Sequence, residues 1–362
     1  MKNVLVGQSG GPTSVINSSV LGALEAALDN PSITRVFGMA HGIKGLLNDD
    51  LYDIDKEDRD ELALLRYTPS SALGSCRYKL ADPDVDDTDY KRILEIFKKY
   101  DIRYFFYNGG NDSMDTCNKV SKYMMKSGYE CRVMGIPKTI DNDLWGTQVT
   151  FGFQSAMNIA VEVIDSIHST AFSHSRVFIV EIMGHKAGWL TLHAGIASGA
   201  DVIVIPEIPY DARAIAAAIQ QRAREGKRFS IVAVAEGAIS REEAAMSKKD
   251  FKAARAAMPY PSISYRLADE LQKITSQEIR VTIPGHFQRG GAPCAADRLL
   301  CTRLGVAAAE LIREGKFGNM VAVQNDRIVP VPLKEVAGRL KTVPVDGELV
   351  HAARELGLCM GD

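Results

Sequence analysis

From Val4 onward, short apolar segments alternate with small-residue loops and with segments of helical periodicity. The first repeat is a strand at Val4–Gly7, a loop at 8–14 and a helix from Val15 to Leu28. Such an order favours mainly parallel sheets with helices on their faces. Further strands are predicted at 33–39, 103–107, 132–136, 176–182, 201–205, 230–235 and 279–283, the last being the last long strand before the loop at 284–291. Further helices are predicted at 90–100, 153–168, 189–199 and 212–225, with a polar connection at 51–60 and a solvated helical excursion at 241–257.

The length of 362 residues suffices for two domains of ordinary size. We predict an α/β fold of two doubly wound, mainly parallel-sheet domains, with the ligand in the cleft between them. One domain would comprise residues 1–150 and part of the segment at about 288–335. The other would comprise residues 151–287 and the C-terminal segment at about 336–362.

Composition and charge limit the classes of partner that this protein is expected to bind. A formal net charge of −2 gives no electrostatic reason to bind nucleic acid or an anionic membrane surface. The first apolar run is too short for a signal peptide, and no later stretch is long and apolar enough to span a membrane. We therefore expect a cytoplasmic protein. The six cysteines form no Cys-x-x-Cys pair, which favours reduced structural thiols over a disulfide frame or a zinc site.

Three small-residue loops could hold an anion, and two of them, 8–14 and 108–113, directly follow predicted strands. The loop Gln8–Ser14 contains Gly10 and Gly11, and unpaired backbone amides at a following helix N-terminus attract phosphate. It is not a Walker A loop, and a tight turn in a βα unit is nearly as good an account. The loop 68–77 ends in Arg77, which could reach a phosphate or could lie on the surface. The loop 108–113 repeats the strand, glycine turn and helix plan.

The segment Lys138–Asp143 concentrates charge after an apolar strand that ends in proline. On an extended backbone Asp141 and Asp143 point the same way, so they repel unless a cation or a phosphate-bound metal lies between them. This density of charge indicates a ligand site. The alternative is a polar turn that caps a helix starting at Asn142 or Asp143.

Four loops, in this order and spacing, resemble those of the phosphofructokinase family, and the resemblance extends from Val4 to about Gly315. They are Gly10-Gly11, Gly109-Gly110-Asn111-Asp112-Ser113, Pro137-Lys138-Thr139-Ile140-Asp141-Asn142-Asp143 and Gly285-His286-Phe287-Gln288-Arg289-Gly290-Gly291. In addition, Met183-Gly184-His185, Glu236 and Arg280 fall where that family keeps its sugar-phosphate contacts.

The resemblance implies phosphoryl transfer to the 1-hydroxyl of fructose 6-phosphate, from ATP or from inorganic pyrophosphate. Asp141 matches the catalytic base, with Thr139 and Asp143 as positioning partners. Arg280, Arg289 and His286 match the clamp on the 6-phosphate. Arg176 matches a group that reaches across from a neighbouring subunit, although a surface arginine is the simpler account, so a homodimer or homotetramer is implied. The implied substrate-binding set is Gly11, Thr139, Asp141, Arg176, Met183, Gly184, His185, Glu236, Arg280, His286 and Arg289.

Two positions bear on the donor. In the family, pyrophosphate users carry a second acidic residue and a lysine, matched by Asp112 and Lys138. A carboxylate at 112 would occupy the place of the nucleotide α-phosphate, and like charges ~4 Å apart repel by about 4 kcal/mol at an effective dielectric near 20. The resemblance therefore implies a reversible pyrophosphate-dependent 6-phosphofructokinase. It also implies that the domain 1–150 binds the phosphoryl donor and that the domain 151–287 binds the sugar phosphate. The implied catalytic residues are Asp141, Lys138, Asp112 and Thr139. The implied donor loop consists of Gly11, Arg77, Gly110, Asp112 and Ser113.

The open alternatives are an ATP-dependent 6-phosphofructokinase, a relative of NAD or lipid kinases and a non-catalytic sugar-phosphate sensor.

Two positions depart from the family pattern. Asn111 replaces an aspartate that helps to hold Mg²⁺, so the Mg²⁺ ligands expected here are Asn111 and Asp143, directly or through water. His185 replaces an arginine, which makes sedoheptulose 7-phosphate a possible second substrate.

Overall fold

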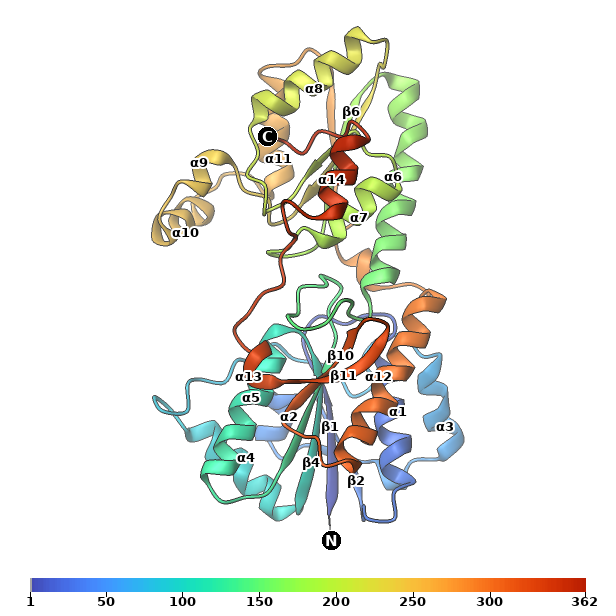
Figure 1. Cartoon of the computed structure of the whole chain (residues 1–362), viewed down its shortest axis with the longest axis vertical. Helices are drawn as coiled ribbons and strands as arrows, with labels where there is room; N and C mark the ends of the chain where they lie inside the picture. Colours follow the sequence, from blue (N-terminus) through green and yellow to red (C-terminus); the bar gives the residue numbers. More distant parts are fainter. Residues whose placement is uncertain (1) are drawn as a thin grey trace. The chain divides into compact units, whose positions relative to one another are not determined.

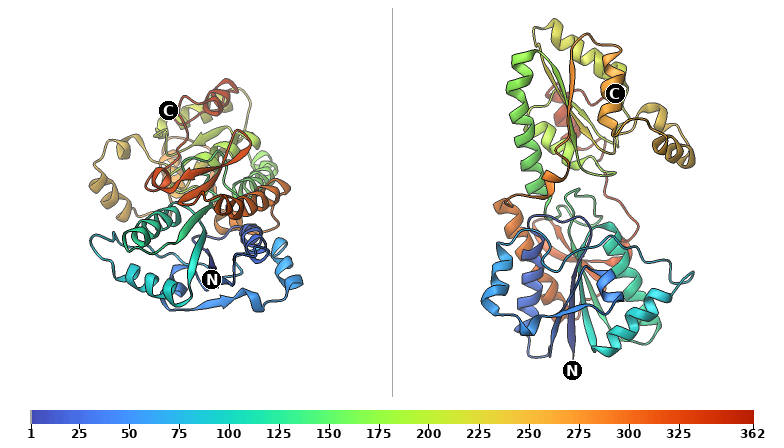
Figure 2. Two further views of the ribbon diagram at one scale, coloured as in Figure 1. Left: turned by 60° about the horizontal axis from the view of Figure 1, so that its bottom comes forward. Right: turned by 180° about the vertical axis from the view of Figure 1, so that it is seen from behind.

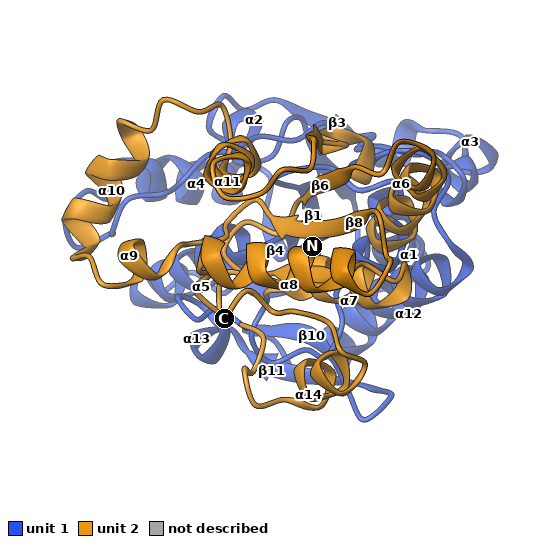
Figure 3. Cartoon of the chain, turned by 90° about the horizontal axis from the view of Figure 1, so that it is seen from above, with its two compact units in different colours: residues 1–140, 144–155, 289–341 blue, residues 141–143, 156–288, 342–362 orange. Residues whose placement is uncertain are grey.

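The computed structural model describes residues 2–362 (Figure 1). The chain divides into two compact units, coloured separately in Figure 3. Unit 1 comprises residues 1–140, 144–155 and 289–341, and unit 2 comprises residues 141–143, 156–288 and 342–362. In the described part of the chain, no helix is both long enough and apolar enough to cross a membrane. The six cysteines are free thiols, and Cys117, Cys131 and Cys301 are buried.

Unit 1 is built on a seven-stranded sheet in the order β11-β10-β5-β4-β1-β2-β3. The strands are β1 (Asn3–Gln8), β2 (Val36–Met39), β3 (Leu51–Asp53), β4 (Ile102–Gly109), β5 (Arg132–Pro137), β10 (Asn319–Gln324) and β11 (Arg327–Pro332). The edge strands β3 and β11 are antiparallel to their neighbours, and the five between them are parallel. The carboxyl ends of β5, β4 and β1 therefore meet at one edge of the sheet.

Helices cover both faces of this sheet (Figures 1 and 2). Alternate residues of a strand face opposite ways, and in β1 Val4 and Val6 enter one core while Leu5 enters the other. The first core contains α1 (Ile16–Leu28) and α12 (Ala295–Arg313), which pack closely. The opposite core contains α2 (Ile43–Leu47), α4 (Thr88–Lys99), α5 (Asn111–Lys126) and α13 (Leu333–Val336). Short turns of helix at η1 (Ile54–Lys56), α3 (Arg59–Ala63) and η2 (Leu64–Arg66) complete the unit.

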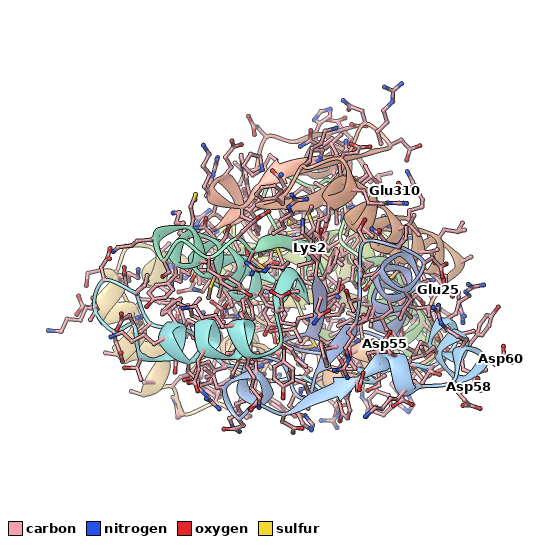
Figure 4. The ribbon with its side chains drawn as sticks, turned by 90° about the horizontal axis from the view of Figure 1, so that it is seen from below. Lys2, Glu25, Asp55, Asp58, Asp60 and Glu310 are labelled. Atoms are coloured by element: carbon pink, nitrogen blue, oxygen red, sulfur yellow. The ribbon has the colours of Figure 1, made fainter. Side chains whose placement is uncertain are left out.

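Figure 4 views the end of unit 1 at which the strands begin, next to Lys2. Glu25, Asp55, Asp58 and Asp60 lie around this end, and the side chains of Asp58 and Asp60 project outward into solvent. None of the predicted site residues belongs to this end of the sheet. Predicted site residues of unit 1 such as Gly11, Gly110 and Lys138 follow β1, β4 and β5 at the opposite end.

Unit 2 contains a parallel four-stranded sheet in the order β7-β8-β6-β9. Its strands are β6 (Val177–Ile182), β7 (Val202–Val204), β8 (Ser230–Ala235) and β9 (Ile279–Thr282). Apolar side chains of the sheet pack with α8 (Ala212–Arg224) and α11 (Ile263–Gln272) in one core. The other helical segments are α6 (Phe153–His174), α7 (Trp189–Ala197), α9 (Arg241–Ala244), α10 (Lys248–Ala256), η3 (Gly285–Arg289) and α14 (Glu348–Glu355). Of these, α6 begins with three residues of unit 1, and η3 ends with one, Arg289.

The predicted α/β fold with mainly parallel sheets is confirmed, and the structure adds three local details. The predicted strand at 279–283 contains β9, and two strands that were not predicted, β10 and β11, follow it. The polar connection at 51–60 contains the short strand β3. The helical excursion at 241–257 consists of two short helices, because α9 ends at Ala244 and Ser247 starts α10 by accepting a hydrogen bond from Asp250 N at 3.2 Å.

Candidate functional site

The first glycine loop of unit 1 is held by the loop 68–77. The amide of Gly10 donates to Cys76 O at 3.1 Å, and Ser75 Oγ donates to Gly10 O at 2.6 Å. Gly10 has φ +75°, a left-handed conformation that favours glycine. Arg77, next to Cys76, is exposed. The two predicted small-residue loops therefore form one connected structure.

Two cationic side chains lie against the same glycine turn. Lys138 follows β5, is only 3% exposed, and donates from Nζ to Gly11 O at 2.6 Å. A Cβ at Gly11 would lie 2.8 Å from Cζ of Arg289, so the Arg289 guanidinium approaches this backbone closely. Arg289 was predicted as part of the sugar-phosphate clamp, and the structure places it in unit 1 beside the predicted donor loop.

The third loop forms the N-terminus of α5. Gly110 is the N-cap residue without a side-chain cap, and Asn111, Asp112 and Ser113 form the first turn. Ser113 is buried. The Asp112 side chain is 74% exposed and pairs with Lys79, with 3.4 Å between Nζ and Oδ1. An exposed pair of this kind contributes little to stability, although an acidic residue suits a helix N-terminus.

The charged segment after β5 forms no helix. Its first residue pairs with β4, because Lys138 N donates to Gly109 O at 2.9 Å. The backbone then turns through Asn142, which has φ +53°, and the next helix begins only at Phe153. The alternative of a helix cap at Asn142 or Asp143 is therefore wrong. Lys138 and Thr139 belong to unit 1, whereas Asp141 and Asp143 are grouped with unit 2.

In unit 2, the loop after β6 is held through its backbone amides. The amides of Gly184 and His185 donate to Glu236 Oε1 at 3.3 and 2.8 Å, and Met183 N donates to Gln288 Oε1 at 3.3 Å. His185 is exposed with φ +50°. Since β8, β6 and β9 are neighbours, Glu236, this loop and the segment that carries His286 lie at the same edge of the sheet.

Two side chains that support this loop were not predicted from the sequence. Gln288 is only 2% exposed and also donates from Nε2 to Gly285 O at 3.2 Å, which fixes the turn that carries His286. Glu207 accepts from Gly188 N at 3.0 Å and from Val343 N at 2.9 Å. The position of Gln288 within the loop 285–291 was a signal for its role. No comparable signal marked Glu207.

Arg176 and Arg280 lie together at the other end of the unit 2 sheet. Both pair with Glu278, and the hydrogen bond from Arg176, with the nearby charge of Arg280, lowers the pKa of that carboxyl. Arg176 precedes β6, whereas the loop 183–185 follows it, and six strand residues span roughly 20 Å at ~3.3 Å each. Within one unit 2, these two arginines are therefore separated from His185 and Glu236.

The residues described here include no group of three or more His, Cys, Asp or Glu side chains placed to hold a metal. Asn111 begins α5 in unit 1, and Asp143 is buried in unit 2. Mg²⁺ commonly keeps several waters and binds through one or two carboxylates together with substrate phosphates. A sparse set of oxygen ligands fits such an ion when a phosphate donor brings it.

The profile of a protein family described as Phosphofructokinase matches residues 3–312 of this sequence. The chain belongs to the phosphofructokinase family. Phosphoryl transfer to fructose 6-phosphate, the activity expected from the four loops, is thereby supported. The family match favours this activity over that of a relative of NAD or lipid kinases.

The chain is 44% identical over 361 residues to a protein of Spirochaeta thermophila named ATP-dependent 6-phosphofructokinase, covering 98% of this chain and 96% of that relative. A protein of Propionibacterium freudenreichii subsp. shermanii with the same name is 40% identical, with 98% of each sequence covered. Among solved structures, the pyrophosphate-dependent phosphofructokinase of Nitrosospira multiformis matches with TM-score 0.84 and 29% identity. That of Marinobacter aquaeolei matches with TM-score 0.81 and 30% identity, and each match covers 99% of this chain and 88% of the other.

Proposed function

We propose that this phosphofructokinase takes its phosphoryl group from inorganic pyrophosphate and transfers it reversibly to the 1-hydroxyl of fructose 6-phosphate. The observation that carries this proposal is the placement of Lys138. Its ammonium is buried against Gly11 O in the glycine turn, where positive charge would meet the phosphate that departs. In this proposal unit 1 binds the donor and unit 2 binds the sugar phosphate.

Asp112 supports the same choice of donor. Its carboxylate stands exposed at the N-terminus of α5, next to Gly110, where a bound phosphate chain would approach the helix amides. Repulsion from a nucleotide phosphate ~4 Å away would be about 1 kcal/mol in water-like surroundings and about 4 kcal/mol at an effective dielectric near 20, so it would weaken ATP binding by roughly fivefold to a thousandfold. Pyrophosphate, which has no third phosphate, avoids this repulsion. Gly11, Arg77 and Ser113 complete the proposed donor loop.

For the transfer step, Asp141 is the proposed base that takes the proton of the attacking hydroxyl, and Thr139 and Asp143 position it. Asn111 and Asp143 would hold Mg²⁺ together with the donor phosphates, and the ion would neutralise charge that develops during transfer. The proposed sugar-binding groups at the loop edge of unit 2 are Met183, Gly184, His185, Glu236 and His286. The enzyme would act in the cytoplasm.

The proposed clamp on the sugar 6-phosphate includes two arginines that lie far from the other sugar-binding groups within a single unit 2. Arg176 and Arg280 lie at the end of the sheet opposite the loop 183–185, so they would serve the site of a second copy of the chain. A homodimer or homotetramer with sites completed across subunits follows from this proposal. Arg289, beside Gly11, would then be the arginine of the clamp that the chain supplies to its own site.

ATP is the second candidate donor. It is favoured by the names of the relatives, since the proteins of Spirochaeta thermophila and Propionibacterium freudenreichii are both named ATP-dependent. Two solved structures of similar fold, those of Nitrosospira multiformis and Marinobacter aquaeolei, are named pyrophosphate-dependent at about 30% identity. Those of Pichia pastoris and Saccharomyces cerevisiae are named phosphofructokinase without a stated donor. Sequence similarity alone therefore points both ways, and the side chains at 112 and 138 favour pyrophosphate.

The test is a coupled assay that offers each donor separately with fructose 6-phosphate and Mg²⁺. We expect turnover with pyrophosphate and none with ATP. The reverse reaction, from fructose 1,6-bisphosphate and phosphate, should also proceed. Robust turnover with ATP and none with pyrophosphate would reject the proposal and leave the ATP-dependent enzyme. The same assay with sedoheptulose 7-phosphate would show whether His185 admits a second sugar.

A further inference from the structure

The carboxylate of Asp297 is completely buried in the first turn of α12. Oδ1 accepts from Gly152 N at 3.0 Å, and Oδ2 accepts from both Ser155 N and Ser155 Oγ at 2.7 Å. Ser155 Oγ in turn accepts from Cys294 N at 3.0 Å. Asp297 therefore ties the start of α12 to the turn Thr150–Ser155, which precedes and begins α6.

This turn also holds the backbone of the charged segment after β5. Thr150 is completely buried and donates from Oγ1 to Thr139 O at 2.7 Å, and Phe151 pairs in parallel with Lys138. Gly152, with φ +94°, lies so close to Thr13 that a Cβ there would be 2.4 Å from Thr13 Cγ2. The turn thus contacts both the first glycine loop and the segment 138–140.

Burial of a carboxylate is expensive, and burial raises the pKa of Asp297 while the hydrogen bonds from Ser155 oppose that rise. The N-terminal amides of a helix can be capped by a residue close in sequence, so a partner as distant as Asp297 is not needed for that purpose alone. Elsewhere in this chain Asp58, Asp211 and Ser247 cap their own helices locally. At α6 the amide of Ser155 in the first turn donates to a residue 142 positions away in the sequence. This connection fixes the turn relative to the sheet rather than merely satisfying a helix end.

We propose that Asp297 is a positioning residue for phosphoryl transfer, which acts through the turn Thr150–Ser155 on the Lys138–Thr139 backbone. With Gly109 O on one side and the turn on the other, the peptide of Lys138 is held from both sides, and its ammonium is aimed at Gly11. This inference rests on the proposed role of Lys138. A displacement of ~1 Å in a group that contacts the reacting phosphate can cost roughly a hundredfold in rate.

The sharpest test is a pair of changes at Thr150. Thr150→Val removes the hydroxyl that donates to Thr139 O, whereas Thr150→Ser keeps it. We expect Thr150→Val to lower kcat by about tenfold or more while the KM for fructose 6-phosphate stays within about threefold, and Thr150→Ser to retain most of the rate. Asp297→Asn should show the same pattern as Thr150→Val. Equal rates for the Thr150→Val and Thr150→Ser variants would overturn the proposal even if Asp297→Asn does not fold.

Asp201 provides a matched control, because it is a largely buried carboxylate of unit 2 that accepts from Ile231 N at 2.9 Å. Asp201→Asn should lower the melting temperature without the selective loss of kcat. In a Lys138→Met background, Thr150→Val should lower kcat by less than about twofold, because residues that act as a unit are non-additive. Full additivity would show that the turn acts on something other than Lys138.

Failure of the donor proposal is distinguishable from failure of this inference. All variants are assayed with whichever donor supports turnover of the unmodified enzyme. If that donor is ATP, the donor proposal fails. The ratio between the Thr150→Val and Thr150→Ser rates still decides whether the turn positions the transfer site.

Discussion

At the scale of single residues, the glycine turn of unit 1 is notable for the charge placed against it. Lys138 Nζ donates to Gly11 O, and the Arg289 guanidinium lies close to the same residue. Removing an ammonium from water costs several kcal/mol unless polar partners replace the solvent. Lys138 and Arg289 therefore place two positive charges beside a glycine backbone that leaves no room for further side chains. An anionic ligand could approach this backbone closely and meet both charges.

Lys138→Met keeps the length of the side chain and removes its charge. We expect kcat with pyrophosphate to fall roughly a hundredfold, as it does when a donor to developing charge is removed. The melting temperature should change little, because methionine tolerates burial. The measurement is steady-state kinetics with thermal unfolding, and the control is Lys316→Met, an exposed lysine paired with Glu314. Unchanged kcat would mean that the ammonium serves only the packing of the turn.

At the scale of elements, the loop after β6 depends on side chains from two other segments. Glu236, which follows β8, accepts hydrogen bonds from two of its backbone amides, and Gln288 in η3 accepts one from a third. Because Gln288 also binds Gly285 O, it links the loop 183–185 to the segment that carries His286. The proposed sugar-binding edge of unit 2 therefore depends on η3 as much as on β6.

Gln288→Leu removes both hydrogen bonds and leaves buried polar groups unpaired. Loss of about 1–1.5 kcal/mol of loop ordering should raise the KM for fructose 6-phosphate by roughly five- to tenfold. The KM for the donor should not change. The matched control is Gln272→Leu, since Gln272 also accepts a backbone hydrogen bond in unit 2, from Ile279 N at 3.3 Å. An equal rise of KM in both variants would contradict a specific role for Gln288.

The elements that could be predicted from sequence were those with a strong apolar run followed by a glycine loop, such as β1, β4 and β5. The hairpin β10–β11 was missed because Pro330 and Pro332 argue against a strand. Proline is tolerated at β11 only because it is an edge strand. The Asn325-Asp326 turn, with both residues at positive φ, was the signal that could have revealed it.

In the candidate site, too, some residues could be predicted from the sequence and others could not. Lys138 and Asp141 could be proposed from residue types and spacing, because charged groups after apolar strands are visible in a sequence, and Glu236 could be proposed from the family resemblance. Their partners are tertiary and could not be read locally. The Lys138–Gly11 contact spans 127 positions, and the Asp297–Ser155 contact spans 142. Arg289 was assigned to the sugar clamp from its motif alone, which gave no indication that it lies beside Gly11.

At the scale of the whole molecule, Arg176 and Arg280 set a condition on assembly. They pair with Glu278 at the opposite end of the unit 2 sheet from the loop that carries His185. If they bind the 6-phosphate, they bind it for another copy of the chain. A site divided in this way can be rebuilt from two defective chains.

Asp141→Asn and Arg176→Ala should each be inactive alone for different reasons. Mixing the two proteins under conditions that exchange subunits should restore about a quarter of the normal activity in a dimer, because half of the dimers are mixed and each contains one intact site. Activity of the mixture and of each variant is measured at equal chain concentration. No recovery, with exchange verified by light scattering of tagged subunits, would place Arg176 outside the site.

Unit 1 is assembled from segments at both ends of the sequence, and this has a consequence for synthesis. Until residues 319–324 emerge from the ribosome, β5 has no neighbour on its outer side and α1 lacks α12, so a nascent chain ending at residue 288 displays an open strand edge and an uncovered apolar helix face. Premature termination between residues 288 and 319 would therefore yield an aggregating fragment rather than a smaller working protein.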